Sequence, residues 1–226
     1  MPVLNERGNI ERIVSEINKA VETDFLFIDD NSTDGTREYV DKLVKIQPKR
    51  FHVIKRAKKL GLASAYLEGF EWALRNNYKF IVQMDADFSH QPRFLPEIFH
   101  ELTHCDLVIG SRYVAGGRVE NWSLMRKFIS RGGSMYSRMI LGVKIKDFTG
   151  GFNGWKATSL IRIGLNNIKS QGYWFQIEMK YRAAKAGLNY KEIPIVFPDR
   201  TVGESKMSFK IVTEALLKVW SLRFRK

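Results

Sequence analysis

The amino-acid sequence predicts an α/β fold in which helices cover a mostly parallel central sheet. Along the first half of the chain, short continuous apolar runs alternate with stretches whose apolar residues recur at helical spacing. This alternation is typical of βαβ units, whose strands are buried on both faces. Two of the apolar runs end directly in acidic clusters, Asp29-Asp30 and Asp85-Ala86-Asp87. Ligands bind at this end of the strands in such sheets, so we expect the two clusters to share one site.

The first half of the chain contains the regular part of the pattern. Segments 25–28 and 51–54, the run that ends at Met84, and segment 107–109 are expected to be strands, and apolar spacing indicates helices over about 10–21, 39–44, 63–75 and 94–102. The opening segment, Pro2-Val3-Leu4-Asn5-Glu6, is typical of the carboxyl end of a further strand. The Asx-rich turn 30–35 is expected to cap a helix that begins near Thr36.

The second half is less regular, and we expect it to belong to the same domain. A long amphipathic helix is predicted from about Leu124 to Leu141, and a helix from about Tyr173 to Ala186 leads into alternating apolar residues from Ile193 to Phe197. The tail from Met207 to Leu222 places its apolar residues on one helical face and is followed by a basic end. No repeat, low-complexity segment or linker divides the chain, so residues 1–226 are predicted to form a single domain.

Composition restricts the partners and the compartment. The chain of 226 residues carries a formal net charge of +13 and has a pI of about 9.8. This balance favours an anionic partner such as nucleic acid, a phosphorylated substrate or an acidic membrane surface. The single cysteine, Cys105, excludes an internal disulfide framework and fits a reducing compartment. We find no secretory signal and no apolar run near the roughly 18 residues that span a bilayer, so a cytoplasmic location is expected.

The heptapeptide Met84-Asp85-Ala86-Asp87-Phe88-Ser89-His90 carries the most specific chemistry in the sequence. Side chains two residues apart in an extended segment point to the same side, so both carboxylates can face one point in space. Their mutual repulsion requires solvent, a proton, a basic partner or a metal. Hard divalent cations such as Mg²⁺ or Mn²⁺ take oxygen ligands and are often shared with phosphates. The alternative is a helix-capping aspartate in a polar turn before Pro92.

A second metal motif is present but is not expected to bind metal. His100-Glu101-Leu102-Thr103-His104 matches the zinc-protease pattern. The apolar residues between Phe94 and Leu102 define one face of this helix, which leaves His100 and His104 nearly opposite that face. A solvated helix face is therefore the better interpretation of the two histidines.

Basic side chains could provide partners for phosphates. They are Arg112 in Gly110-Ser111-Arg112-Tyr113, Arg126 and Arg131 in the long helix, and Arg200 and Lys206 in segment 199–206. Arginine binds phosphate through a bidentate fork. For each residue alone a solvated surface position is the better interpretation. Together with an Asp-x-Asp on the same sheet edge, these residues indicate a site for a metal-bound diphosphate.

The motifs occur in the order seen in family 2 glycosyltransferases of the GT-A fold, which the chain resembles over nearly its whole length. The shared segments are Pro2–Glu6, Ile28–Thr36, Met84–Asp87 and Gly110–Tyr113. Gly172–Met179 and the stretch from Glu192 to Lys206 are similar to dolichol-phosphate mannose synthases and their bacterial polyprenol-monophosphomannose counterparts. The resemblance implies a GT-A fold, which is a Rossmann-like three-layer sandwich around a mostly parallel central sheet.

The resemblance also implies how the donor, GDP-mannose, is bound. About residues 1–110 would form the nucleotide-sugar half of the domain, and about 111–226 the acceptor half, which ends in the basic amphipathic helix. The residues that would border the guanosine are Pro2, Leu4, Glu6, Ile28 and Asp30. Asp85, Ala86 and Asp87 would meet the ribose and diphosphate, with Asp85 and Asp87 as ligands of Mg²⁺ or Mn²⁺ and Asp87 as the main one. Arg112, Arg200 and Lys206 would hold the donor phosphates.

For the acceptor, the resemblance implies a polyprenyl (dolichyl-type) phosphate. Its phosphate would be received by Arg131, together with Arg126 and Ser134. This phosphate is already anionic and needs no general base. It would attack the anomeric carbon from the face opposite GDP and give a β-linked polyprenyl phosphate mannose by inversion. Asp87, Arg112 and Arg131 are the expected catalytic residues, which act by positioning and by stabilising charge.

Two alternative functions remain at this point. A relative that transfers glucose from UDP-glucose would share the fold and the metal site. A basic nucleic-acid-binding module is motivated by the net charge of +13, but we find no aromatic-interleaved basic motif and expect no nucleic-acid partner.

The lipid acceptor requires contact with a membrane. We expect a peripheral position at the cytoplasmic face, through Met207–Lys226 and the basic helix near Arg131. Core packing is an equal alternative for the last helix. An integral-membrane partner is the alternative source of the anchor.

Overall fold

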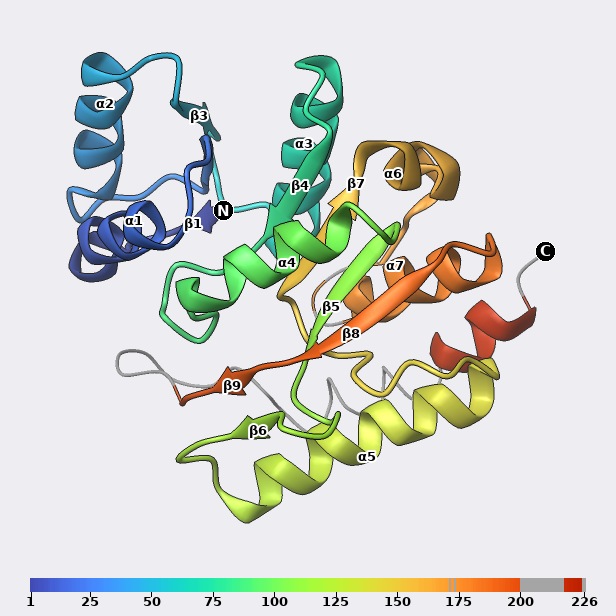
Figure 1. The fold of residues 1–226 in the computed structure, drawn as a ribbon. Coiled ribbons are helices and arrows are strands. Elements are labelled where there is room, and N and C mark those ends of the chain that lie inside the picture. The colour runs from blue at the N-terminus through green and yellow to red at the C-terminus, as the bar shows by residue number, and fades with distance from the viewer. Residues whose placement is uncertain (171, 173, 200–217, 225–226) are drawn as a thin grey trace.

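The computed structural model describes residues 1–170, 172, 174–199 and 218–224 (Figure 1). In chain order the strands are β1 (Pro2–Val3), β2 (Phe25–Asp29), β3 (Phe51–Lys55), β4 (Phe80–Gln83), β5 (Leu107–Ser111), β6 (Arg118–Val119), β7 (Asn153–Lys156), β8 (Tyr190–Pro194) and β9 (Val196–Phe197). The helices are α1 (Arg7–Ala20), α2 (Thr36–Ile46), α3 (Leu62–Arg75), α4 (Leu95–Leu102), α5 (Leu124–Leu141), α6 (Ala157–Ile163) and α7 (Trp174–Lys185), and residues 218–224 are also helical.

The described strands form two main sheets and a two-stranded ribbon. In the first sheet β2 lies between β1 and β3, and both pairings are parallel. In the second sheet the order is β4-β7-β5-β8, with β5 and β8 parallel and β7 antiparallel to both of its neighbours. β6 and β9 pair in parallel. The prediction of a mostly parallel arrangement is confirmed, with β7 as the exception.

β7 is a strand that the apolar pattern did not predict, and its residues explain why. It reads Asn153-Gly154-Trp155-Lys156 and contains one large apolar residue. A Cβ atom on Gly154 would lie 2.5 Å from Cγ2 of Ile98 and 2.9 Å from Cδ1 of Leu102 in α4. The glycine therefore allows α4 to pack directly on the middle of the sheet. The same glycine removes the continuous apolar run by which a buried strand is recognised.

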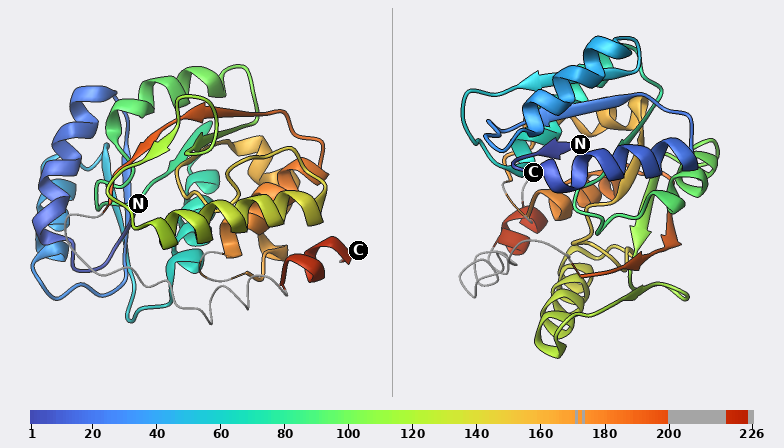
Figure 2. Two further views of the ribbon diagram at one scale, coloured as in Figure 1. Left: turned by 90° about the horizontal axis from the view of Figure 1, so that it is seen from below. Right: turned by 90° about the vertical axis from the view of Figure 1, so that its left-hand side faces the viewer.

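Helices cover both faces of the strands and produce three layers, as predicted. Successive residues of β5 alternate between two cores. Leu107 and Ile109 belong to the core formed with α3, α6 and α7, while Val108 belongs to the core formed with α1 and α4. The alternation follows from the two-residue period of a strand. Figure 2 shows the same arrangement from two further sides, with α5 running along one end of the molecule.

Up to residue 199, the predicted helices are confirmed within a few residues. α5 has the expected bounds because its ends carry strong signals: the Ser123 hydroxyl accepts from the backbone amide of Arg126, and Gly142 adopts a left-handed φ of 67°. At the start of α2, the Asp34 carboxylate accepts from the backbone amide and the hydroxyl of Thr36, so this turn caps the helix as expected.

Two further expectations concern exposed segments. His100 and His104 are solvent-exposed at the end of α4, which confirms the interpretation of that motif as a solvated helix face. Most of the tail from Met207 lies outside the described residues. Its described end buries Val219 and Leu222 in the core beside α5, while Trp220 and Phe224 are exposed. Across the described ranges, no helix has both the length and the apolarity needed to cross a bilayer.

Candidate active site

The Asp-x-Asp segment follows β4 and forms a tight turn at the carboxyl end of that strand. The Asp85 carboxylate accepts from the Tyr66 hydroxyl at 2.8 Å, and the Asp85 backbone amide donates to Nδ1 of His90 at 2.8 Å. The Asp87 carboxylate accepts from the backbone amide and the hydroxyl of Ser89, at 3.1 and 2.6 Å. Phe88, directly after Asp87, adopts a left-handed φ of 62°. Protein hydrogen bonds therefore fix the shape of this turn.

Tyr66 orients Asp85 without neutralising it. Burial raises the pKa of Tyr66 well above its usual range, and the charges of Asp85 and Asp87 raise it further. The hydroxyl consequently stays protonated at neutral pH and remains a hydrogen-bond donor. Tyr66 thus orients the carboxylate of Asp85 through a neutral hydroxyl donor.

Asp85 and Asp87 fit a hard divalent cation better than a zinc ion. Both side chains offer carboxylate oxygens, and in the part of the chain that the structure describes no cluster of three His, Cys, Asp or Glu residues could enclose a metal by itself. Mg²⁺ is usually held by one or two carboxylates, and substrate phosphates and water complete its coordination. The donor set therefore matches a cation that is shared with a diphosphate.

The acidic cluster at the end of β2 is engaged in buried ion pairs. Asp29 is fully buried, and its carboxylate lies 2.5 Å from Nε of Arg37. Asp30, predicted to border the nucleoside, accepts from Nη1 of Arg56 at 2.6 Å. Arg56 also donates to the hydroxyl of Ser64 in α3. Because both carboxylates already face a guanidinium, this cluster is a poor candidate for a second metal site.

β1 and β2 bring the other predicted nucleoside residues to one end of the first sheet. Pro2 lies opposite Ile28 in the parallel register, and Leu4 is half-buried beyond it. The loops after the two strands are interlocked, because the backbone amide of Glu6 donates to the Thr36 hydroxyl at 2.8 Å. Pro2, Leu4, Glu6 and Ile28 therefore lie near one another, while their contact with a nucleoside stays a prediction.

Arg112 forms a buried ion pair with Asp147. Its Nε and Nη2 each lie 2.7 Å from a carboxylate oxygen of Asp147, and its backbone amide donates to the same carboxylate at 2.9 Å. Nη2 also donates to the Thr149 hydroxyl at 2.8 Å. Burial alone would raise the pKa of Asp147, but the charge and hydrogen bonds of Arg112 outweigh it and lower the pKa to about 2. The bidentate fork expected to hold donor phosphates is thus directed at a protein carboxylate.

Lys180 supports the loop 147–150, which contains Asp147 and Thr149. It was not predicted as a site residue. Its side chain is fully buried, and Nζ donates to the backbone carbonyls of Asp147 and Gly150 at 2.7 and 2.8 Å. Burial lowers the pKa of Lys180 to about 8, although the charge of Asp147 opposes this shift. The available sequence signals were an aspartate close to the Gly150-Gly151 pair and a lysine within a buried helix. Neither signal indicates that the lysine and the aspartate lie together in the folded chain.

Two predicted acceptor residues of α5, Ser134 and Arg131, lie near this loop. Ser134 is buried, and its hydroxyl oxygen lies 3.3 Å from that of Thr149. Arg131 is exposed about one turn earlier in the helix. Its charge acts on the nearby Tyr113 hydroxyl, where burial raises the pKa on balance and Arg131 opposes the rise. Two hydroxyls and an exposed guanidinium in one region form a combination that suits a phosphate.

Arg126, the third predicted acceptor residue, is bound to protein groups. It stacks on Trp122, 3.9 Å from the ring centre, and forms an ion pair with Asp199. Trp122 packs edge-on against Phe197 with 5.4 Å between ring centres, and Phe197 packs against His90 at 5.6 Å. These contacts connect Arg126 in α5 to His90 in the Asp-x-Asp heptapeptide.

Several contacts lie beyond what the motifs indicated. Tyr66 and Thr149 touch predicted residues but come from distant parts of the chain, and no pattern marked them. His90 had a signal, because it belongs to the Asp-x-Asp heptapeptide. Arg200 and Lys206, predicted to hold the donor phosphates, lie outside the described residues.

Comparison with known proteins defines the class of this enzyme. The model of glycosyl transferase family 2 matches residues 1–164, so the chain belongs to that family. Over 228 residues the chain is 43% identical to the undecaprenyl-phosphate mannosyltransferase of Micrococcus luteus, a match that covers 100% of this chain and 93% of the relative. It is 42% identical over 229 residues to the polyprenol monophosphomannose synthase of Mycolicibacterium smegmatis, covering 100% of this chain and 86% of that protein.

Solved structures confirm the GT-A type of fold. Glucosyl-3-phosphoglycerate synthase from Mycobacterium tuberculosis in complex with phosphoglyceric acid superposes with a TM-score of 0.68 at 17% identity, covering 97% of this chain and 78% of that chain. The same enzyme in complex with Mn²⁺, UDP and glucosyl-3-phosphoglycerate gives a TM-score of 0.66 at 16% identity, covering 98% and 76%.

Proposed function

We propose that this glycosyltransferase moves mannose from GDP-mannose to a polyprenyl (dolichyl-type) phosphate and inverts the anomeric configuration. The observation that carries the proposal is a series of packed rings, which leads from His90 beside Asp85 through Phe197 and Trp122 to Arg126. Arg126 lies in α5, the helix that also carries Arg131 and Ser134. Two relatives that align with the whole chain are named for mannose and polyprenyl phosphate chemistry, which supports the same reaction. Residues 1–110 would bind the donor, and residues 111–226 the acceptor.

The donor would bind across the ends of β1, β2 and β4. The residues proposed to border its guanosine are Pro2, Leu4, Glu6, Ile28 and Asp30, and Asp85, Ala86 and Asp87 would meet the ribose and diphosphate. Asp85 and Asp87 would hold a Mg²⁺ or Mn²⁺ ion, which supplies positive charge to the departing diphosphate. Arg200 and Lys206 would add further positive charge to the donor phosphates.

Transfer needs no general base, because the acceptor phosphate is already an anion. One of its oxygens attacks the anomeric carbon from the face opposite GDP. The new carbon–oxygen bond forms as the bond to the diphosphate breaks, and the electron pair leaves with GDP. Arg131 and Ser134 hold the acceptor phosphate, while the Arg112–Asp147 pair keeps Thr149 beside Ser134. The protein thus positions two phosphates of like charge on opposite sides of one carbon.

A transfer assay with Mn²⁺ and a short polyprenyl phosphate tests this reaction, with labelled GDP-mannose and UDP-glucose offered separately. We expect lipid-linked mannose from GDP-mannose only, and a loss of at least about 100-fold in Asp87→Ala. Asp41→Asn is the matched control, because Asp41 forms a partly exposed ion pair with Lys55 outside the proposed site. Transfer from UDP-glucose would assign the alternative donor. Absence of transfer by a folded chain, with salt-sensitive nucleic-acid binding that survives Asp87→Ala, would contradict the proposal.

α5 would place this site at the cytoplasmic face of a membrane. Large apolar side chains are exposed along this helix, at Leu124, Met125, Phe128, Met135 and Met139. Four of these positions, 124, 128, 135 and 139, recur at spacings of four and seven and so form one stripe. Arg131 and Arg138 are exposed on the same helix. An exposed apolar stripe with basic residues suits an anionic lipid surface, and the helix carries Arg131 to the depth of lipid phosphates.

Sedimentation with vesicles of phosphatidylcholine and anionic phosphatidylglycerol tests this position. The double variant Phe128→Ser and Met135→Ser should bind at least about tenfold more weakly than the wild-type chain. Ile161→Ser is the control, because Ile161 is a similarly exposed apolar residue on α6. A wild-type chain that does not bind these vesicles would contradict direct docking, and an integral-membrane partner would then be the anchor.

A further inference from the structure

A fully buried ammonium group supports the loop 147–150 beside the proposed acceptor site. Nζ of Lys180 lies 2.7, 3.4 and 2.8 Å from the backbone carbonyl oxygens of Asp147, Phe148 and Gly150. An ammonium group carries three N–H donors and no acceptor, so it can serve all of these oxygens at once. The carbonyls of one short loop therefore converge on a single positive charge.

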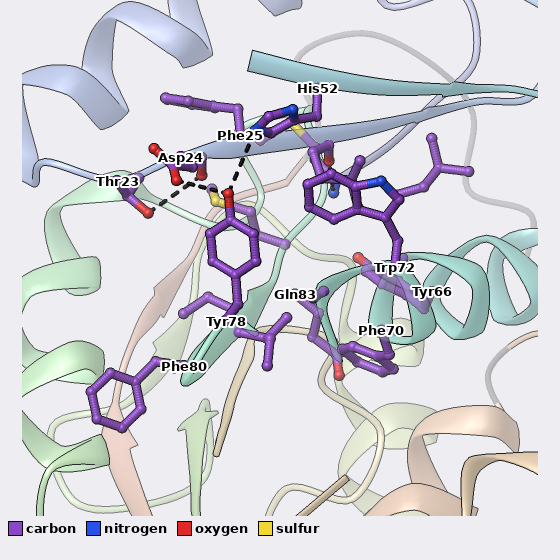
Figure 3. A pocket seen from close by; sticks show the side chains of 18 of the residues that line it. Thr23, Asp24, Phe25, His52, Tyr66, Phe70, Trp72, Tyr78, Phe80 and Gln83 are labelled. Carbon is purple, nitrogen blue, oxygen red and sulfur yellow. Dashed lines mark hydrogen bonds between the residues drawn. The ribbon is translucent and has the colours of Figure 1, made fainter. Parts of the chain in front are cut away.

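The helix behind this loop is fixed to the second sheet. Lys180 lies one turn after Gln176 in α7, so the two side chains project from the same face of the helix. The side-chain oxygen of Gln176 accepts from Nε2 of Gln83 at 3.1 Å and from Nδ2 of Asn153 at 3.2 Å. Gln83 ends β4 and also lines an apolar cavity of about 130 Å³ that residues of β2 and β4 border (Figure 3). Both β4 and β7 thus hold α7 in place.

The direction of a carbonyl determines the direction of the amide in the same peptide. In a trans peptide the C=O and N–H bonds point in opposite directions, and no peptide bond of this loop is cis. Because the carbonyl of Phe148 faces Lys180, the backbone amide of Thr149 faces away from it. Among the described residues this amide donates to no protein acceptor. Backbone amides directed in this way are frequent ligands of anions.

The hydroxyl of Thr149 is also directed by its partner. Its oxygen accepts from Nη2 of Arg112 at 2.8 Å. A guanidinium group only donates, so the proton of the Thr149 hydroxyl must be given to another acceptor. The hydroxyl oxygen of Ser134, at 3.3 Å, is distant for an O–H···O bond. A phosphate oxygen is a charged and therefore stronger acceptor.

The loop lies between the two parts of the proposed site. On one side, Thr149 approaches Ser134 in α5. On the other side, a Cβ atom on Gly151, the residue after the loop, would lie 3.3 Å from Cε1 of His90. His90 accepts from the backbone amide of Asp85. A group bound at Thr149 would thus lie between α5 and the Asp-x-Asp heptapeptide.

We infer that Thr149 binds the phosphate of the acceptor through its hydroxyl and its backbone amide, and that Lys180 is the positioning residue that holds both donors in place. This role rests on the proposed transfer to a polyprenyl phosphate. Lys180 does not touch the substrate and acts through the carbonyls of Asp147, Phe148 and Gly150. Without the ammonium group these buried carbonyls would lack their partner, and the loop would turn toward other donors.

The protonation of Lys180 gives this role a signature. Burial lowers its pKa to about 8, and the charged groups that face it are Asp147 in the loop, Arg112 after β5 and Glu192 in β8. None of these three groups changes its charge between pH 7 and pH 9. A neutral amine has two N–H donors and a lone pair that cannot face a carbonyl oxygen. Acceptor binding should therefore weaken as the pH rises through 8.

Calorimetry with geranyl phosphate, a short polyprenyl phosphate, tests the inference on the full chain with Mg²⁺ and GDP present. At pH 7, Lys180→Met should weaken binding by about tenfold or more. Lys185→Met is the matched control, because Lys185 is exposed on the same helix. Thr149→Val should weaken binding by a similar factor, and Thr149→Ser should recover most of the affinity. At pH 9 the wild-type affinity should approach that of Lys180→Met, which should not change between pH 7 and pH 9.

Wild-type affinity for geranyl phosphate in either Lys180→Met or Thr149→Val would overturn the inference. Equal weakening of GDP binding in Lys180→Met would also overturn it, because that result indicates a general loss of structure. If Lys180→Met does not fold, the pH dependence of the wild type and the two Thr149 variants give the answer. A wild-type chain that does not bind geranyl phosphate would instead contradict the proposed acceptor, so the two failures are distinguishable.

Discussion

Asp147→Asn removes the negative charge that holds Arg112, and it should lower the free energy of unfolding by about 3–5 kcal/mol at pH 7, the usual cost of breaking a buried ion pair. The structure accounts for this size in two parts. The change in the pKa of Asp147 from 3.8 to about 2 corresponds to roughly 2 kcal/mol. Lost hydrogen bonds supply the rest, because asparagine has one acceptor oxygen where the carboxylate accepts from Arg112 and from the Gly150 amide.

The charge contribution of Asp147 depends on pH with a definite sign. Its pKa is lower in the folded than in the unfolded chain, so its stabilisation is nearly complete above about pH 5 and is lost as the pH falls toward 2. Between pH 5 and pH 3, this group alone should remove about 1 kcal/mol from the stability of the wild-type chain. The Asp147→Asn chain should lack that component. Urea unfolding followed by tryptophan fluorescence at both pH values measures the difference.

The control for this experiment is Asp41→Asn. The Asp41–Lys55 pair is partly exposed, and such pairs contribute at most about 1 kcal/mol. Wild type and variant share all other carboxylates, so the difference in unfolding free energy between the two proteins reports on Asp147. The reasoning is refuted if Asp147→Asn costs less than about 1 kcal/mol at pH 7. It is equally refuted if wild type and Asp147→Asn lose stability in parallel between pH 5 and pH 3.

Three further substitutions test other contacts. Tyr66→Phe removes the hydrogen bond to Asp85, and calorimetry should show Mn²⁺-dependent GDP binding weakened by about tenfold or more. Arg131→Ala should raise the KM for polyprenyl phosphate by at least about tenfold, with the donor KM little changed and partial recovery in Arg131→Lys. Gly154→Ala places a methyl group 2.5 Å from Ile98, and fluorimetry should show a melting temperature lower by about 2–10 °C. An unchanged GDP affinity would contradict the expectation for Tyr66→Phe, and an unchanged acceptor KM would contradict that for Arg131→Ala. An unchanged melting temperature would contradict the expectation for Gly154→Ala.

Features with local signals were predictable from the sequence. α5 was placed at Leu124–Leu141 because amphipathic spacing gave its length, and Ser123 and Gly142 stand at its two ends. The Asp-x-Asp turn was recognisable because both carboxylates and His90 lie within seven residues. In such cases the interaction that shapes the element connects residues close in the sequence, so a pattern in the chain reports it directly.

Features that depend on distant contacts were not predictable in the same way. Arg112 was expected to face a phosphate, but Asp147, 35 residues further along, pairs with its guanidinium. Lys180 reaches the carbonyl of Asp147 from a helix 33 residues beyond. A single sequence carries no signal that Arg112 pairs with Asp147 or that Lys180 reaches the carbonyl of Asp147. Burial and long-range packing decide which charged groups come together.

The order of strands in the second sheet has a consequence for how the chain folds during synthesis. β1, β2 and β3 are complete once Lys55 has been made, and each pairs with a near neighbour in sequence. β4 must wait about seventy residues for β7, and β5 must wait about forty residues for the same strand. At roughly 5–20 residues per second, these apolar strands have no permanent partner for several seconds on the ribosome. In a nascent chain arrested before Asn153, β4 and β5 would therefore expose apolar side chains and unpaired backbone groups. We expect chaperones to bind such a chain.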